Sequence, residues 1–477
     1  MNAKPFLPSL AMGLILAGCA VGPNYHPPQT TTPPDFAAAA DNNFSTNEPI
    51  ADWWRGFNDP ELTRLVERAA ASNLDLRIAT AHLLEARALR LGARADLGPA
   101  VDGVAGYTKT RYSEAALFEA PGVPRNQELY NAGFDATWEL DFFGRLRRAQ
   151  SAASASVQAA QFGRRDVLVS VAGEVARNYF ELRGAQNELG VLRRNAGNQD
   201  ETLKITQARF DAGSGTELDV ARARAQLNST LADIPPAESA VAHAIHRLGV
   251  LTGLQPEALA GELQDARPLP ALPQLVAIGN PSQLLRRRPD IRAAERNLAD
   301  ATARIGVAVA DLFPRVTFNG AIGLQATSFS GLGKGGSDNW SFGPAITWAA
   351  LDYAHVRSRV GAAGAEAAAQ LAGYEKTVLT SLEETENALV DFGRARARRD
   401  FLAESVKASQ EAATLARDRY NNGATDFLTV LDSERVLLEA QDQLAQTETQ
   451  TATALVAVYK ALGGGWEADE RTTPAVR

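Results

Sequence analysis

Hydrophobic and polar positions follow two different periods along this chain. Over two long stretches the apolar residues recur every seven positions, as in the series Leu168, Val175, Leu182, Leu189 and Ala196. Heptads sustained over such a length are typical of long helices packed against neighbouring helices. No proline interrupts residues 125–234 or 345–473, so helices far longer than usual are permitted. A helix from about residue 140 to 212 would be on the order of 100 Å long.

Each helical stretch is interrupted once, by a short polar turn. The interruptions are residues 209–216 and 419–426, and they contain Gly213 and Gly423. Glycine at such a point suits the left-handed conformation that ends a helix. A threonine or an aspartate follows each glycine as an N-cap for the returning helix. The sequence therefore predicts, in each half, an antiparallel pair of very long helices joined at a tip.

Segments ahead of the long helices alternate between apolar and polar residues with a period of two. They predict β-strands at about residues 99–110, 129–139, 314–326 and 339–349. Strands of ~10 residues with aromatic ends are the signature of a membrane β-barrel, although an ordinary half-buried sheet shares the alternation. The long polar loops between the strands favour the barrel. Pro344 fits such a strand only at a bulge or a strand end.

Four strands cannot close a barrel, and an open sheet edge is not tolerated in lipid. Three copies would supply twelve strands, enough to surround an aqueous lumen. The expected fold is therefore mainly α with membrane β, in which a trimeric 12-stranded β-barrel continues into a 12-helix α-barrel.

The chain is one structural unit written twice. Asp75-Leu76-Arg77 returns as Asp290-Ile291-Arg292, and Arg209-Phe210 returns as Arg419-Tyr420. Internal repeats of this kind indicate pseudo-symmetric assembly. We expect a first repeat at residues 59–265, a second at 266–465 and a C-terminal tail at 466–477.

The N-terminus has the pattern of a secreted lipoprotein. Residues 1–18 read as a signal peptide that ends in Leu16-Ala17-Gly18-Cys19, a lipobox in which Cys19 is acylated, with palmitate expected. Cys19 is the only cysteine, which excludes an intrachain disulfide framework. Ala20, rather than an aspartate, follows it and favours the outer membrane. Residues 19–58 read as a lipid-anchored N-terminal tether.

Composition excludes several other functions. The net charge of −8 disfavours nucleic acid as a partner. The one short basic run, Arg286-Arg287-Arg288, is interpreted as a solvated helix start rather than a phosphate-binding patch. The five histidines are scattered, and neither a metal site nor a nucleophile–base pair stands out. We expect no catalytic residues, no metal and no cofactor, and hence no enzyme.

Several motifs together resemble the TolC-like outer-membrane efflux proteins, in particular the lipoprotein branch that serves resistance–nodulation–division pumps. Besides the lipobox and the two tips, they are Gly22-Pro23-Asn24-Tyr25, the segment 53–62, the segment 138–145 and Arg287-Arg288-Pro289-Asp290-Ile291-Arg292. The resemblance implies a homotrimer in the outer membrane of a Gram-negative bacterium, extending into the periplasm. It implies the exit channel of a tripartite pump in multidrug resistance, a passive duct with an equatorial belt. Its partners would be a periplasmic adaptor and an inner-membrane transporter.

The resemblance also implies a periplasmic gate among residues of the inner helices. Carried over, Arg419, Tyr420, Asp432 and Arg435 fall on gate positions, and Asp219 could add to the ring by internal alignment. The expected adaptor contacts are the tip residues Gly213, Ser214, Gly215, Thr216, Gly423, Ala424, Thr425 and Asp426.

Two alternatives stay open on the sequence. One is a type I secretion conduit, and the other is an anchored scaffold lipoprotein that bridges the periplasm without a pore. A scaffold has no use for outward-facing Trp340, Phe342, Ile346 and Trp348. The exported substrate is not specified by the sequence.

Overall fold

A computed structural model describes residues 20–40, 44–48, 50–113 and 124–466. The chain divides into two compact units. The first, called the sheet unit here, comprises Met1–Gln29, His82–Ala160 and Ala293–Glu375. The second, called the helical unit, comprises Thr30–Ala81, Gln161–Arg292 and Lys376–Arg477. Each sequence repeat contributes to both units, so the compact units do not coincide with the repeats.

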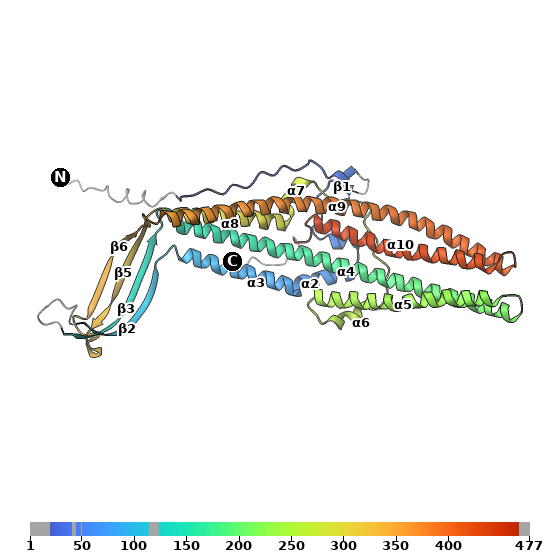
Figure 1. Ribbon diagram of the computed structural model, residues 1–477, viewed down its shortest axis with the longest axis horizontal. Coiled ribbons are helices and arrows are strands. Elements are labelled where there is room, and N and C mark those ends of the chain that lie inside the picture. The colour runs from blue at the N-terminus through green and yellow to red at the C-terminus, as the bar shows by residue number, and fades with distance from the viewer. Residues whose placement is uncertain (1–19, 41–43, 49, 114–123, 467–477) are drawn as a thin grey trace, which may run out of the picture. The chain divides into compact units, whose positions relative to one another are not determined.

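The sheet unit contains a four-stranded antiparallel sheet (Figure 1). Its strands are β2 (Ala100–Arg111), β3 (Asn126–Leu140), β5 (Arg315–Ala326) and β6 (Asp338–Thr347), in the order β2-β3-β5-β6. These bounds lie close to the four ranges that the alternation predicts. Within the described chain, β2 and β6 are left as the two edges of the sheet.

The register separates the two faces of this sheet by polarity. Phe134 pairs with Ile322, which pairs with Trp340, and directly paired residues point to the same face. The next row, Asp135 with Ala321, lies on the opposite face. The apolar row is not covered within the chain, because the exposed fractions of Ile322 and Trp340 are both 66%. One face is therefore apolar and open, and the other is lined mainly by polar and small residues.

A pair of glycines lets β3 and β5 approach each other closely. Gly133 pairs with Gly323 on the polar face, and a Cβ on Gly133 would lie 2.4 Å from the carbonyl oxygen of Ile322. Only glycine allows this close approach of two backbones.

Pro344 lies inside β6, opposite Phe318, rather than at a bulge or a strand end. Within one subunit β6 is an edge strand, where proline is tolerated.

The first long helix lies close to the predicted range of about 140–212, and the second half contains a helix of similar length. α4 (Arg145–Asp211) has 67 residues and α9 (Tyr353–Asn421) has 69. They return as α5 (Glu217–Leu251) and α10 (Phe427–Ala461), each pair closed by a turn (Figure 1). α5 runs through Pro235 and Pro236, both of which lie on its exposed side.

Shorter elements complete the two units. They are η1 (Ala37–Ala40), η2 (Trp53–Phe57), α2 (Pro60–Ser72), α3 (Leu74–Ala95), η4 (Pro256–Leu259), α6 (Ala260–Leu263), α7 (Pro281–Arg287), α8 (Pro289–Ala310), η5 (Phe329–Gly331), and the strands β1 (Phe44–Ser45) and β4 (Val276–Ala277). None of the helices in the described chain has a stretch that is both long and apolar enough to cross a bilayer.

Aromatic residues of η2 form the centre of the core in the helical unit. Trp53 stacks on Tyr459 with ring centroids 5.0 Å apart, and Phe57 meets Phe180 edge-on at 4.9 Å. Asp59 then caps α2, because its Oδ1 accepts from the amides of residues 61 and 62. The segment 53–62 therefore packs against α4 and α10.

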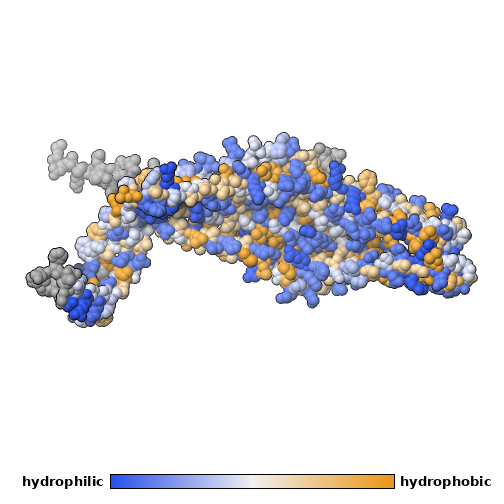
Figure 2. All heavy atoms as spheres, viewed as in Figure 1, coloured by the Kyte–Doolittle hydropathy of each residue, from blue (hydrophilic) through white to orange (hydrophobic). Residues whose placement is uncertain are grey.

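On the surface, hydrophobic and hydrophilic residues are interspersed along the helices (Figure 2).

A short two-stranded pairing lies in the helical unit. β1 and β4 pair in parallel there, with Phe44 opposite Val276. Residue 466 is the last described, so the remaining tail, like Cys19 and its lipobox, lies outside the described residues.

Candidate gate at the helical tips

The two tip turns have the same backbone. At the first, the amide of Gly213 donates to Phe210 O at 2.9 Å, and at the second the amide of Gly423 donates to Tyr420 O at 3.0 Å. Both glycines have a left-handed backbone, with φ of 72° and 74°. This is the helix ending for which glycine is preferred. The expectation of two helix–turn–helix tips is confirmed.

The returning helices are capped by side chains. Thr216 Oγ1 accepts from the amide of Asp219 at 3.2 Å, and Asp426 Oδ1 accepts from the amide and the hydroxyl of Thr429 at 3.0 and 2.7 Å. The hydrogen bonds from the hydroxyl and then the amide of Thr429 lower the pKa of Asp426. Both caps satisfy amides that a helix start otherwise leaves unpaired.

A small apolar core closes the second tip and joins it to the first. Its buried members are Ala223, Ala416, Tyr420, Phe427 and Val430. The rings of Tyr420 and Phe427 are 5.6 Å apart, and Tyr420 is only 9% exposed. The ring of Tyr420, a predicted gate residue, is thus packed inside its own subunit.

Arg209 links the two tips through Tyr420. Its guanidinium carbon lies 4.1 Å from the centre of the Tyr420 ring. Its Nη2 also donates to Tyr420 O at 3.1 Å and to Asn421 O at 3.2 Å. Stacking on an aromatic face while donating to carbonyl groups is a geometry suited to arginine rather than lysine. Arg209 therefore fastens the end of α4 to the end of α9.

A partly buried ion pair lies about one turn further from the second tip. Arg417 Nη2 lies 2.6 Å from Glu434 Oε1, and Glu434 is 6% exposed. The pair joins α9 to α10. Removing Arg417 would be costly, because the buried carboxylate of Glu434 would lose this charged partner.

The predicted gate residues have different environments. Asp432 and Arg435 form an exposed ion pair on α10 at 2.9 Å, and this hydrogen bond raises the pKa of Arg435. Arg419 is exposed. Asp219 is engaged by its own cap, since its Oδ2 accepts from Thr216 Oγ1 at 2.7 Å. Within one subunit these side chains do not form a single cluster.

The tip residues expected to contact an adaptor are mostly exposed. Six are exposed, namely Gly213, Ser214, Thr216, Gly423, Ala424 and Asp426, whereas Gly215 and Thr425 are half-buried. A Cβ on Gly215 would lie 3.0 Å from the amide nitrogen of Phe210, a close contact, although the second tip carries Thr425 at the equivalent position.

Sequence reasoning missed Arg209, Arg417 and Glu434. Arg209 carried a signal, because it is the repeat counterpart of Arg419, which was assigned to the gate. The duplication predicts equal surroundings for the two arginines, yet among the described residues only Arg209 has an aromatic partner. Arg417 and Glu434 gave no signal, since charges on a long helix are usually solvated.

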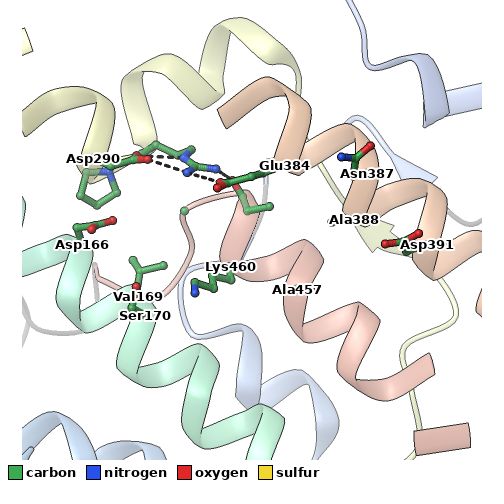
Figure 3. Close-up of a pocket in the computed structure, with 14 residues that line it drawn as sticks. Asp166, Val169, Ser170, Asp290, Glu384, Asn387, Ala388, Asp391, Ala457 and Lys460 are labelled. Carbon is green, nitrogen blue, oxygen red and sulfur yellow. Dashed lines mark hydrogen bonds and ion pairs between the residues drawn. The ribbon is translucent and has the colours of Figure 1, made fainter. Parts of the chain in front are cut away.

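A second charged cluster lies at the base of α10, in a cavity lined by Asp166, Arg288, Asp290, Glu384 and Lys460, among others (Figure 3). Arg288 lies 2.7 Å from Asp290 and 2.8 Å from Glu384, and it is 8% exposed. The expectation of a solvated basic run is therefore wrong at Arg288. The sequence pattern could not reveal that α9 presents Glu384 to this side chain.

Comparison with known proteins identifies the class. The profile of the outer membrane efflux protein family matches residues 65–254 and 280–464. The solvent efflux pump outer membrane protein SrpC of Pseudomonas putida is 33% identical over 482 residues, covering 97% of this chain and 99% of that protein. Nodulation protein T of Rhizobium leguminosarum bv. viciae is 30% identical over 469 residues, covering 98% and 95%. The solved structure of the outer-membrane channel OprN matches with a TM-score of 0.88 and 42% identity, covering 94% of this chain and 100% of that one.

The sheet, the long helical hairpins and these matches define a TolC-like outer-membrane channel, a class of transport ducts that are not enzymes. The chain belongs to the outer membrane efflux protein family. The resemblance to TolC-like channels is confirmed.

Proposed function

We propose that this chain is the exit channel of a tripartite efflux pump, working as a homotrimer that forms a passive duct through the outer membrane. The observation that carries the proposal is the open four-stranded sheet, with one apolar face and one polar face. Lipid requires every strand edge to be paired. Three copies, each pairing its β6 with the β2 of the next, would close twelve strands around a polar lumen.

Exposed apolar side chains on the helices support the same assembly. On α3, Leu84, Leu89 and Leu91 are more than half exposed, and on α9 so are Leu379 and Phe401. Single exposed apolar residues are common on soluble proteins. Repeated ones along two long helices favour burial against further helices, as a 12-helix α-barrel would provide.

The gate would lie at the tips, with Asp432 and Arg435 facing the axis. Three copies of Asp432 that converge on one axis repel one another. Arg435, which already pairs with Asp432 at 2.9 Å, would offset that repulsion and hold the closed state. Arg419, Tyr420 and Asp219 would complete the ring. An adaptor protein that packs its own helices between the exposed tips would favour the open state.

The remaining partners follow from the family and the N-terminus. A periplasmic adaptor and an inner-membrane resistance–nodulation–division transporter would complete the pump. An acyl group on Cys19 would add a lipid anchor in the outer membrane. The relatives are named for different cargoes and roles, solvent efflux and nodulation among them, so we assign no cargo to this chain.

The test is assembly and conductance of the purified protein. We expect a trimer in detergent and a small conductance in planar bilayers. Asp432→Ala should raise the conductance severalfold by weakening the gate. Tyr420→Phe tests whether the hydroxyl, rather than the ring, takes part.

A matched control is Asp400→Ala, which removes an exposed acid paired only with its neighbour Arg399 among the described residues. This variant should conduct like the parent. Unchanged conductance in both Asp432→Ala and Tyr420→Phe would remove the gate assignment. A single water-soluble subunit without a pore would remove the channel itself.

A further inference from the structure

The first described residues, Ala20–Tyr25, belong to no helix or strand, yet they are fixed to the sheet unit by specific contacts. The amide of Val21 donates to Phe143 O at 3.1 Å. Phe143 lies in the short connection between β3 and α4. We call Ala20–Tyr25 the N-terminal strap.

Arg148 in the first turn of α4 binds the strap through three acceptors. Its Nε donates to Val21 O at 3.0 Å, and its Nη2 donates to Gly22 O at 3.1 Å and to Asn24 Oδ1 at 2.9 Å. All three acceptors are neutral and belong to the strap. A guanidinium offers several donors in a fixed plane, so Arg148 can bind two successive backbone carbonyls and a nearby side-chain amide at the same time.

Glycines on both sides of the contact allow the strap to lie against the helices. Gly22 has φ +86°, and a Cβ there would lie 2.5 Å from the Cα of Gly306 in α8. Gly144 has φ +79°, and a Cβ there would lie 2.6 Å from the Cα of Ala20. Side chains at these positions would strain the backbone and displace the strap. Arg148 in turn covers Gly306, whose Cβ would lie 2.8 Å from its Cδ.

Tyr25 fixes the other end of the strap. Its hydroxyl donates to Glu295 Oε1 of α8, and the guanidinium of Arg296 lies 5.5 Å from its ring centre. Arg296 also donates to Gln158 Oε1 at 3.0 Å, which ties the same cluster to α4. Burial, followed by the hydrogen bond to Glu295, raises the pKa of Tyr25, so the hydroxyl stays a donor at any physiological pH.

We propose that α4 and α8 form a binding groove for the chain's own N-terminal segment, and that Arg148 is the residue that recognises it. Each residue of Gly22-Pro23-Asn24-Tyr25 except the proline has a contact that depends on its side chain or on the lack of one. The sequence motif is thus a docking motif for an intramolecular site.

The groove determines where the lipid anchor begins. Ala20, the first described residue, lies against Gly144, four residues after β3 ends at Leu140. If Cys19 is acylated, as proposed above, the strap holds the lipid beside the end of the sheet. The lipid then restrains the folded body directly, and not only through the extended segment after Tyr25. This last step rests on the proposed function, whereas the groove does not.

The test measures how tightly the strap is held once it is cut from the body. A protease recognition sequence is inserted between Gln29 and Thr30 of the full chain. Residue 19 is changed to serine and the leader to a non-lipoprotein one, so that no lipid retains the fragment in detergent. His26→Cys then provides a single cysteine for a fluorophore, and its anisotropy after cleavage reports release of the fragment.

We expect slow release from the parent and, in Arg148→Ala, release faster on the order of a hundredfold, because hydrogen bonds from a charged donor are lost. Gly22→Ala should also speed release, and it cannot misfold the body because it lies in the strap. Arg304→Ala, which removes an exposed pair with Asp300 on α8, should leave the rate unchanged.

Equal release rates in the parent, Arg148→Ala and Gly22→Ala would overturn the groove. Release from the parent as fast as the fluorophore can report would overturn it as well. Conductance of the same samples is measured separately, so failure of the channel proposal would be seen independently of the strap.

Discussion

The two joints at which a returning helix ends beside the start of an earlier helix have the same backbone geometry and different side-chain chemistry. At the first joint, where α5 ends beside α3, Asn73 Nδ2 donates to Leu251 O at 2.9 Å. At the second, where α10 ends beside α8, Arg288 Nη1 donates to Ala461 O, also at 2.9 Å. Asn73 and Arg288 are repeat counterparts. A neutral amide and a guanidinium thus do the same local task.

The difference lies in what else each side chain reaches. Asn73 also accepts from the amide of Leu76, so its contacts stay within α3 and α5. Arg288 reaches Asp290 in α8 and Glu384 in α9. Arg288 thus links α8, α9 and α10 through charged contacts, called the charged brace here. α9 and α10 form the hairpin with most of the predicted gate residues. At these joints the two repeats share their backbone geometry, whereas the equivalent side chains Asn73 and Arg288 make different contacts.

The largest expected effect is the loss of the charged brace. Arg288→Ala should lower the free energy of unfolding by about 3 kcal/mol, because the Ala461 carbonyl keeps only the longer hydrogen bond from Thr385 Oγ1, at 3.4 Å, and two carboxylates lose the guanidinium. Asn73→Ala should cost about 1–2 kcal/mol, since only neutral hydrogen bonds are lost. Thermal melts of the detergent-purified protein, followed by circular dichroism, compare the two.

Arg288→Asn sharpens the comparison, because it builds the chemistry of the first joint into the second. Its cost should fall between those of the two alanine variants. Equal melting temperatures for Arg288→Ala and Asn73→Ala would mean that Asp290 and Glu384 add nothing to the second joint.

The next largest effect concerns the glycines that end the two helices. Gly253 and Gly463 both have positive φ, 73° and 68°. A Cβ on Gly253 would lie 2.4 Å from the backbone oxygen of Ser72, whereas one on Gly463 would have less severe contacts, 2.9 Å from Cγ and 3.1 Å from Cα of Arg288. Gly253→Ala should therefore cost about 3 kcal/mol and Gly463→Ala about 2 kcal/mol. The same melts measure both, and a larger cost at Gly463 would contradict this explanation.

The sequence predicted those features of the fold that depend on residues close together along the chain. The strand alternation, the tip glycines and the N-caps at Thr216 and Asp426 depend on residues a few positions apart, and all could be read directly. The role of Arg288 depends on Glu384, nearly a hundred positions away, and a single sequence does not indicate that contact. Arg209 and Arg419 show the same limit, because the repeat predicts their helix positions but not which aromatic ring each one meets.

These two arginines provide the third prediction. Arg209→Ala removes the guanidinium from the Tyr420 ring and from two carbonyl groups, which should cost about 1–2 kcal/mol at the tips. Arg419→Ala removes an exposed side chain and should cost less than about 0.5 kcal/mol. Hydrogen exchange of the amides at residues 418–424 measures the local effect. Equal exchange in the two variants would show that the tips do not depend on the Arg209 contact.

The smallest effect tests the charge balance of the second joint through pH. Burial, and then the nearby charge of Asp290, raise the pKa of Asp166 to about 6, well above the ordinary value for an unfolded chain. The folded protein therefore binds more protons than the unfolded one between about pH 4 and pH 6, and its stability falls as the pH rises through that window. Asp166→Asn should remove this slope and stabilise the protein by about 1–2 kcal/mol at pH 7. Asp391→Asn changes another carboxylate that lines the same cavity and serves as the control. The melting temperature of Asp166→Asn could instead depend on pH between pH 4 and pH 6 as strongly as that of the parent. Ionisation of Asp166 would then not destabilise the folded protein, and the two joints would differ only in the contacts of Arg288.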